Sequence, residues 1–120
     1  SIRDDLVSYL IEARRAGRRV VGYGAPGKGN TLLNYCGIRP DLLAYTADRN
    51  PYKHGRFTPG VRIPVVPPEH LIDDAPDDVL VLPWNLRDEI TAQLSRTLPA
   101  GTRLIFALPS LEVITLGGAS

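Results

Sequence analysis

The chain has 120 residues, enough to bury one hydrophobic core and too few for two, so we predict a single domain over residues 1–120. Hydrophobic residues make up 43% of the chain and charged residues 22%, a balance that is typical of globular domains. The net charge of +1 excludes a strong overall attraction to nucleic acid or to a membrane, and we expect neither as a partner.

The first predicted element is an amphipathic helix that runs to Gly17. Asp4 follows Ser1 at the spacing of a capping box, and apolar residues then recur at helical intervals. Val20 and Val21 come next and predict a buried strand.

Three glycines follow this strand at the spacing G-x-G-x-x-G: Gly22, Gly24 and Gly27. In dinucleotide-binding folds the first glycine permits a tight turn, the second lets the backbone approach a phosphate, and the third lets the helix pack on the strand. The predicted helix begins near residues 28–30 and ends by Gly37. A second strand over residues 43–47 then ends on Asp48, close to where such folds place an acid that binds a ribose.

The segment 49–60 is predicted to be a loop, because prolines and glycines interrupt it throughout. A short strand over residues 62–66 follows, and its Pro64 places it at a sheet edge because proline cannot donate to a ladder. Pro68 then opens a short helix.

Residues 79–82 form a continuous apolar run, which is typical of a parallel strand buried on both faces. A helix capped by Asn85 should follow, and apolar residues line one of its faces: Leu86, Ile90, Leu94 and Leu98. The last predicted strand covers residues 102–108, and residues 111–120 show no clear pattern.

The alternation of strands and helices predicts an α/β fold with a doubly wound sheet and an additional N-terminal helix. We expect five mainly parallel strands in the order 3-2-1-4-5. Ligands of such sheets bind outside the carboxyl ends of the strands, where the strand order reverses. The glycine turn, Asp48 with its loop, and residues 83–85 should therefore meet in one pocket.

Lys28 stands just after the glycine turn, near the expected position of a phosphate. Gly29 and Asn30 follow it, so the turn lacks the hydroxyl that holds magnesium in a Walker loop. Pro26 also removes one N–H donor. Two interpretations stay open: a phosphate contact, or only a tight turn in which glycine is required.

Asp48 either accepts hydrogen bonds from sugar hydroxyls or caps the loop that follows it. That loop is rich in basic, amide and aromatic side chains: Arg49, Asn50, Tyr52, Lys53, His54, Arg56 and Phe57. Such a cluster in a nearly neutral chain favours an acidic small ligand, and His54 is a candidate contact. The alternative is a solvated loop whose aromatic rings pack on the sheet.

Trp84 and Asn85 follow a buried strand at its carboxyl end. There an indole can stack on a base or a sugar, and an amide can bind a polar edge, although packing and helix capping explain both residues nearly as well. Ser110 has no nucleophile-elbow context and no partners in a recognisable order, so we expect no catalytic residue.

Cys36 is the only cysteine, which excludes an internal disulfide and favours a cytoplasmic protein. His54 and His70 have no cysteines or carboxylates at metal-binding spacing, so we expect no metal site. No stretch approaches the roughly 20 apolar residues of a membrane span. Because the chain begins directly on a helix cap, we expect it to be a piece of a longer protein.

Four motifs occur in a characteristic order: residues 22–34, 48–55, 63–65 with 68–69, and 83–85. Together they resemble the C-terminal domain of the S-adenosylmethionine-dependent C-methyltransferases that act on nucleotide-linked deoxysugars. The resemblance covers nearly the whole chain. It implies a Rossmann-like domain that follows a zinc-binding domain and a domain that binds S-adenosylmethionine.

The resemblance further implies that this domain anchors a nucleotide-linked sugar of the dTDP type and contacts the upstream methyltransferase domain. It places one set of residues along the sugar-nucleotide side of the cleft: Gly22, Gly24, Lys28, Gly29, Asn30, Asp48, Asn50, Lys53 and His54. The catalytic base, the zinc ligands and the methyl donor belong to the absent domains, so we expect this domain to bind no cofactor. Thymidine nucleotides carry a deoxyribose, which leaves the 3′-hydroxyl as the candidate partner of Asp48.

Two other functions stay open. The glycines and Asp48 are compatible with a small NAD(P)-binding oxidoreductase domain, although no acid or base for hydride transfer is visible. A nucleotide-sensing module would need only the same cleft.

Overall fold

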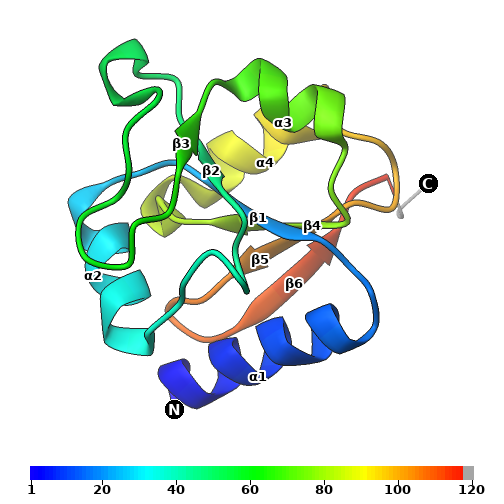
Figure 1. Cartoon of the computed structure of the whole chain (residues 1–120). Helices are drawn as coiled ribbons and strands as arrows, with labels where there is room; N and C mark the ends of the chain where they lie inside the picture. Colours follow the sequence, from blue (N-terminus) through cyan, green and yellow to red (C-terminus); the bar gives the residue numbers. More distant parts are fainter. Residues whose placement is uncertain (118–120) are drawn as a thin grey trace.

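A sheet of six strands forms the centre of the molecule, and helices cover both of its faces (Figure 1). The computed structural model describes residues 1–117, so residues 118–120 of the predicted tail lie outside the described part. The strands are β1 (Val20–Tyr23), β2 (Thr46–Ala47), β3 (Val65–Val66), β4 (Asp78–Val81), β5 (Arg103–Phe106) and β6 (Glu112–Thr115). Across the sheet they follow the order β3-β2-β1-β4-β5-β6.

Four α-helices and two 3₁₀ turns connect the strands: α1 (Ile2–Arg15), α2 (Gly27–Cys36), η1 (Pro51–Lys53), α3 (Pro68–Asp74), η2 (Trp84–Leu86) and α4 (Arg87–Ser95). Helices α1 and α2 cover one face of the sheet, where Leu6 and Leu33 are fully buried (Figure 1). Helices α3 and α4 cover the other face, where Leu71 and Ile90 are buried. Within residues 1–117, no helix has both the length and the apolar character needed to cross a membrane.

The predicted order of the first five strands is confirmed. Strand β1 pairs in parallel with β2 on one side and with β4 on the other, so that Gly22 lies opposite both Thr46 and Leu80. Strand β3 is an edge strand, as Pro64 predicts. The strand order therefore reverses between β1 and β4, at the place where we expect a ligand site.

The prediction of five strands was wrong, because β6 adds a sixth strand that pairs antiparallel with β5. This strand lies in the tail for which the sequence shows no pattern. Only one of its faces packs on the core: Ile114 is half-buried and Leu116 is buried, whereas Val113 is exposed. An edge strand with so few inward residues does not produce a readable alternation.

The helix starts agree with the sequence in one case and differ in another. The Ser1 hydroxyl accepts a hydrogen bond from the Asp4 N–H at 3.2 Å, as the capping spacing predicts. The prediction that Asn85 caps the last helix was wrong. Residue Asn85 lies within η2, and α4 begins only at Arg87, where no side chain caps it.

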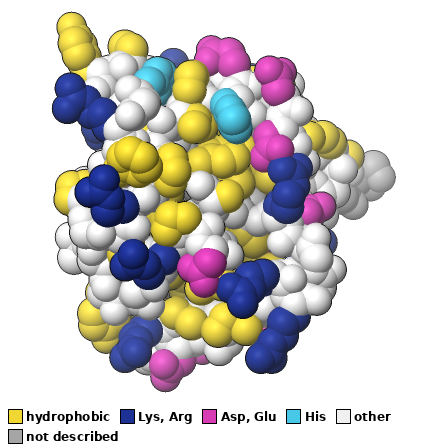
Figure 2. Space-filling view, in the orientation of Figure 1, with side chains coloured by type: hydrophobic (Ala, Val, Ile, Leu, Met, Phe, Trp, Pro, Cys, Tyr) yellow, Lys and Arg dark blue, Asp and Glu magenta, His cyan; other side chains and the backbone are white. Residues whose placement is uncertain are grey.

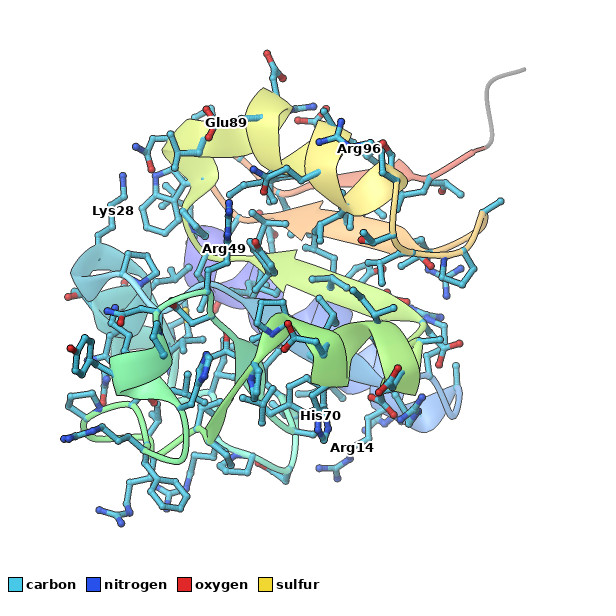
Figure 3. The ribbon with its side chains drawn as sticks, turned by 90° about the horizontal axis from the view of Figure 1, so that it is seen from above. Arg14, Lys28, Arg49, His70, Glu89 and Arg96 are labelled. Atoms are coloured by element: carbon cyan, nitrogen blue, oxygen red, sulfur yellow. The ribbon has the colours of Figure 1, made fainter. Side chains whose placement is uncertain are left out.

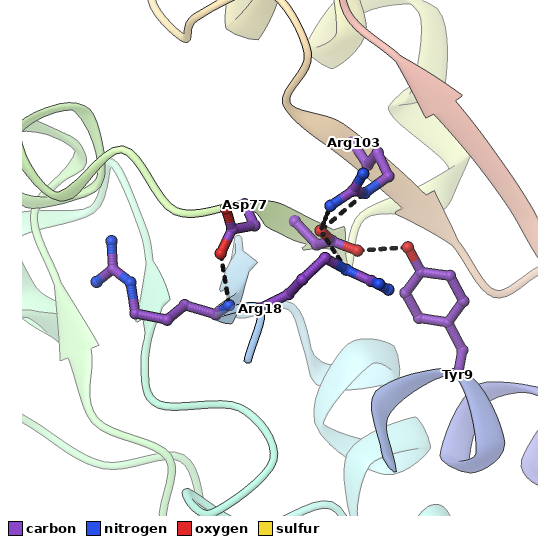
Figure 4. A network of polar contacts seen from close by, with 6 residues as sticks. Tyr9, Arg18, Asp77 and Arg103 are labelled. Carbon is purple, nitrogen blue, oxygen red and sulfur yellow. Dashed lines mark hydrogen bonds and ion pairs between the residues drawn. The ribbon is translucent and has the colours of Figure 1, made fainter. Parts of the chain in front are cut away.

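A buried carboxylate fastens α1 to the sheet at the end opposite the carboxyl termini of the strands (Figure 4). Asp78 is fully buried, and one of its oxygens accepts from Nε and Nη2 of Arg103, each at 3.0 Å. Its other oxygen accepts from the Tyr9 hydroxyl, and Arg18 Nε lies 3.5 Å from the oxygen that Arg103 contacts. Three elements, α1, β4 and β5, and the segment before β1 therefore depend on one charged group.

Candidate functional site

The glycine turn after β1 is packed tightly by the protein's own side chains. A Cβ at Gly22 would lie 2.7 Å from Thr46 Oγ1, and one at Gly24 would lie 2.7 Å from Pro83 Cδ. Gly24 also has a φ of +88°, which side chains rarely adopt. Glycine is required at both positions because Thr46 of β2 and Pro83, which follows β4, pack directly on the backbone there.

The residue that lets α2 pack on the sheet is Gly29, not Gly27. A Cβ at Gly29 would lie 2.9 Å from Leu82 Cβ, whereas one at Gly27 would meet no atom within 4 Å. Our assignment of the third pattern glycine to close packing was therefore wrong by two residues. Gly27 is exposed at the start of the helix.

The N-terminus of α2 has no side-chain cap. Its N-cap residue is Pro26, whose ring cannot accept a hydrogen bond, and the first N–H groups of a helix have no partner within it. Lys53 Nζ donates to the Ala25 carbonyl oxygen at 2.8 Å and brings the loop after β2 against this helix end. The free N–H groups and the helix dipole favour a negative charge here.

A hollow of about 280 Å³ lies between this helix end and the loop, and we name it the α2 hollow. It is lined by Ala25, Pro26, Gly27, Asn30, Lys53, Arg56, Phe57, Thr58, Pro59 and Val65. Lys53 and Arg56 are its only charged lining residues, and none of the others is acidic. The hollow therefore suits an anion.

Three of the predicted ligand residues hold the loop together. Asp48 Oδ1 accepts from the Asn50 N–H at 2.7 Å, and Asn50 Oδ1 accepts from the Tyr52 N–H at 3.0 Å. His54 Nε2 contacts the Asp48 carbonyl oxygen at 2.5 Å. This favours the interpretation in which Asp48 caps the loop, and it leaves Lys53 as the predicted loop residue that lines the α2 hollow.

Trp84 forms a corner between the two layers of the protein, in contact with the hydrophobic cores on both faces of the sheet. Lys28 Nζ lies 5.2 Å from the centre of its ring, within the range of a cation–π contact. Asn85 is exposed. None of the predicted site residues Lys28, Trp84 and Asn85 lines the α2 hollow.

A second hollow of about 180 Å³ lies on the other side of the glycine turn, and we name it the switch-point hollow. It is lined by Tyr23, Gly24, Asp48, Arg49, Pro83, Leu86, Glu89, Ile90 and Gln93. Figure 3 places Lys28, Arg49 and Glu89 toward the same end of the molecule, where β1 and β4 finish. The predicted groups therefore lie at one end of the sheet, as expected.

The three predicted groups do meet in the switch-point hollow, which is lined by Gly24, Asp48, Arg49 and Pro83, but the predicted residues Asn30 and Lys53 line the α2 hollow instead. Gly24 lines the switch-point hollow and the next residue, Ala25, lines the α2 hollow, so the turn separates the two spaces. Pro83 packs directly on Gly24 and occupies room at this turn. Sequence reasoning also missed Tyr23, Glu89 and Gln93, which carry no signal beyond their position at the ends of buried elements.

A third hollow, of about 310 Å³, opens on the face shown in Figure 2, where apolar side chains gather in the centre and Lys and Arg side chains surround them. Its cationic lining is already neutralised. Arg14 pairs with Asp41 at 3.1 Å, Arg19 with Asp74, and Arg18 with the buried Asp78. Each arginine of this hollow already lies within ion-pair distance of a carboxylate, and we do not assign the site to it.

Metal and thiol chemistry find little support in the side chains. Within residues 1–117, no three His, Cys, Asp or Glu side chains gather closely enough to hold a metal ion. His70 lies on α3 and stacks edge-on against Tyr45, with ring centres 4.7 Å apart. Cys36 is buried in α2, and this burial raises the pKa of its thiol.

The sheet order and the two hollows at its carboxyl end define a Rossmann-like α/β domain. The family described as the C-methyltransferase C-terminal domain matches residues 1–109, and the chain belongs to that family. Over 99 residues it is also 38% identical to the C-methyltransferase NovU of Streptomyces niveus. This alignment covers 82% of the chain and 24% of the relative, so the chain spans about a quarter of that protein's length. The resemblance found in the sequence motifs is confirmed.

Proposed function

We propose that this domain anchors a nucleotide-linked sugar, of the dTDP type, for a C-methyltransferase of which this chain is the C-terminal domain. The α2 hollow is the observation that carries the proposal. It brings Lys53, Arg56 and an uncapped helix N-terminus together without an acidic residue. A diphosphate is the part of such a ligand that this combination of charges would hold.

S-adenosylmethionine would supply the methyl group, and we expect it, together with zinc, on parts of the whole protein outside this chain. The packing of the glycine turn supports this division. Protein side chains fill the space beside Gly22, Gly24 and Gly29, so the open space at this turn lies beside Gly27, in the α2 hollow. We propose no catalytic residue in this domain. Its contribution is to hold the substrate against an upstream methyltransferase domain.

A nuclear magnetic resonance titration of the ¹⁵N-labelled chain tests this function, because it also detects weak binding. We expect thymidine diphosphate to shift the amide signals of Gly27, Asn30 and Lys53 in the α2 hollow. NAD and S-adenosylmethionine are the competing ligands. Tight binding of NAD would favour the oxidoreductase alternative, and binding of S-adenosylmethionine would relocate the methyl-donor site.

A matched pair of variants tests the role of charge. We predict that Arg56→Gln weakens thymidine diphosphate binding about tenfold, because it removes one of the two cations of the α2 hollow. Arg39→Gln makes the same change beyond the other end of α2 and should leave the affinity unchanged. Equal losses in both variants would mean that only net charge matters, and would contradict the assignment of the hollow.

A further inference from the structure

Tyr23 is the last residue of β1, and its side chain carries a phenol hydroxyl to the carboxyl end of the sheet. The residue as a whole is only 7% exposed, but its hydroxyl oxygen still reaches the surface, unlike Thr91 Oγ1, which is buried without a hydrogen-bond partner. The Tyr45 hydroxyl, in the adjacent chain segment, donates to Asp74 at 2.7 Å. The Tyr23 hydroxyl has no such partner in the part of the chain that the structure describes.

The Tyr23 side chain borders two adjoining spaces. One is the switch-point hollow, and the other is a groove of about 430 Å³ between α3 and α4. Both are lined by Tyr23, Arg49 and Gln93, so the spaces meet over these three side chains. All three can donate a hydrogen bond. Burial raises the pKa of Tyr23, while nearby Arg49 lowers it and Asp48 raises it further, so the phenol keeps its proton at neutral pH.

The charges around the two sides of the glycine turn differ. The α2 hollow has two cations and no acid among its lining residues. In the switch-point hollow, Arg49 is accompanied by Asp48 and Glu89, so the lining carries no net positive charge. This mixture of donors and acceptors suits hydroxyl groups, which can both donate and accept. Pro83, Leu86 and Ile90 add an apolar surface that suits the face of a ring.

We propose that the switch-point hollow binds an uncharged, hydroxyl-bearing ring of the nucleotide-linked sugar, with the Tyr23 hydroxyl donating to it. The inference rests on the proposed function, which assigns the diphosphate to the α2 hollow. Gly24 lines the switch-point hollow, and the next residue, Ala25, lines the α2 hollow. One ligand can therefore extend across the glycine turn, with its diphosphate in the α2 hollow and a ring in the switch-point hollow. Both the nucleoside and the hexose carry this chemistry.

Two tyrosine variants and three probes test the inference. The probes are inorganic pyrophosphate, thymidine diphosphate and thymidine diphosphoglucose, each titrated into the ¹⁵N-labelled chain. We expect pyrophosphate to shift the amide signals of the α2 hollow residues Gly27 and Asn30 only. At least one of the two ring-bearing probes should also shift Gly24 and Gln93, and a response that requires the glucose identifies the hexose as the bound ring.

Tyr23→Phe should lower the affinity for that ring-bearing probe about three- to tenfold, which is what the loss of one hydrogen bond costs. It should leave the affinity for pyrophosphate unchanged. Its urea unfolding curve should match that of the parent chain, because the hydroxyl has no internal partner. Tyr45→Phe is the matched control. It removes a hydroxyl that is bonded within the protein, so it should lower stability and leave all three affinities unchanged.

The outcomes separate the two proposals. Shifts in the α2 hollow without shifts at Gln93, or an unchanged affinity of Tyr23→Phe for both ring-bearing probes, would overturn the ring site and leave the proposed function standing. A shift of Gln93 by pyrophosphate alone would also overturn the ring site, because it would show an anion there. Shifts at Gln93 with none in the α2 hollow would overturn the diphosphate assignment, and no shift with any probe would overturn both.

Discussion

The buried carboxylate of Asp78 shows how one residue can connect distant parts of this chain. Its oxygens accept from Arg103 on β5 and from Tyr9 on α1, and Arg18 before β1 lies within ion-pair distance (Figure 4). A buried charge is tolerated only when it is paired and hydrogen-bonded, and here both conditions hold. The sequence places Asp78 ahead of an apolar run but does not indicate these partners.

We predict that Asp78→Ala lowers the free energy of unfolding by about 3–5 kcal/mol, because it leaves Arg103 and Arg18 without their shared partner. Urea unfolding followed by circular dichroism measures the change. Asp73→Ala, an exposed position on α3, is the control and should change stability by less than about 0.5 kcal/mol. A loss below 1 kcal/mol in Asp78→Ala would show that the network adds little to the fold.

At the scale of elements, α2 depends on one close contact with the sheet. The approach of Gly29 to Leu82 fixes how near the helix lies to β4 and where its N-terminus faces the α2 hollow. Gly27 has no such contact, although it completes the familiar glycine pattern. Pattern matching therefore found the correct turn but assigned the packing contact to the wrong glycine.

The two glycines of α2 allow a direct test with one substitution. Gly29→Ala should destabilise the chain by about 1–3 kcal/mol, because its Cβ overlaps Leu82 and outweighs the higher helix propensity of alanine. Gly27→Ala adds the same methyl group in open space and should leave stability unchanged or raise it by up to about 1 kcal/mol. Urea unfolding of both variants decides the matter, and equal effects would contradict the assignment of Gly29.

At the scale of the whole molecule, stability should depend on pH at both extremes. An ion pair with Arg87 lowers the pKa of Glu112. Burial pushes the pKa of Asp74 upward, but hydrogen bonds from Arg19 and Tyr45 outweigh it and hold the pKa below its usual value. Burial is the main reason why three phenols have raised pKa values: Tyr9, Tyr23 and Tyr45.

The signs of these pKa shifts predict a plateau of stability between about pH 5 and pH 9. Carboxyl groups with lowered pKa values stabilise the folded state within this plateau, and their contribution is lost as the pH falls below it. Phenols with raised pKa values keep their protons when folded, so alkaline pH favours the unfolded chain.

In Asp74→Asn the loss of stability at acid pH should be smaller than in the parent chain. The difference should be less than about 1 kcal/mol, because the Arg19–Asp74 pair is partly exposed. Urea unfolding from pH 7 to pH 3 measures it, and an unchanged slope would contradict the assignment.

The sequence by itself determined the alternation of elements, the order of the first five strands, the edge position of β3 and the family to which the chain belongs. These features follow from local periodicity, from turn residues and from rules of chain connection, and all of these can be recognised in the sequence without the three-dimensional structure. It also identified the end of the sheet where the hollows lie, because strand order alone locates the switch point.

Only the tertiary structure decided that β6 joins the sheet, that Gly29 is the packing glycine, and that the space at the carboxyl end of the sheet is divided into two hollows. The position of Gly29 and the division of the space depend on contacts between segments that are distant in the chain, whereas β6 pairs with the strand just before it. In the folded chain, Pro83 packs on Gly24 and Lys53 bonds to Ala25, although these residues lie far apart in the sequence. The hydroxyl of Tyr23 belongs to the same class, since a residue that reads as part of a buried strand becomes a candidate ligand contact only when its surroundings leave it without a partner.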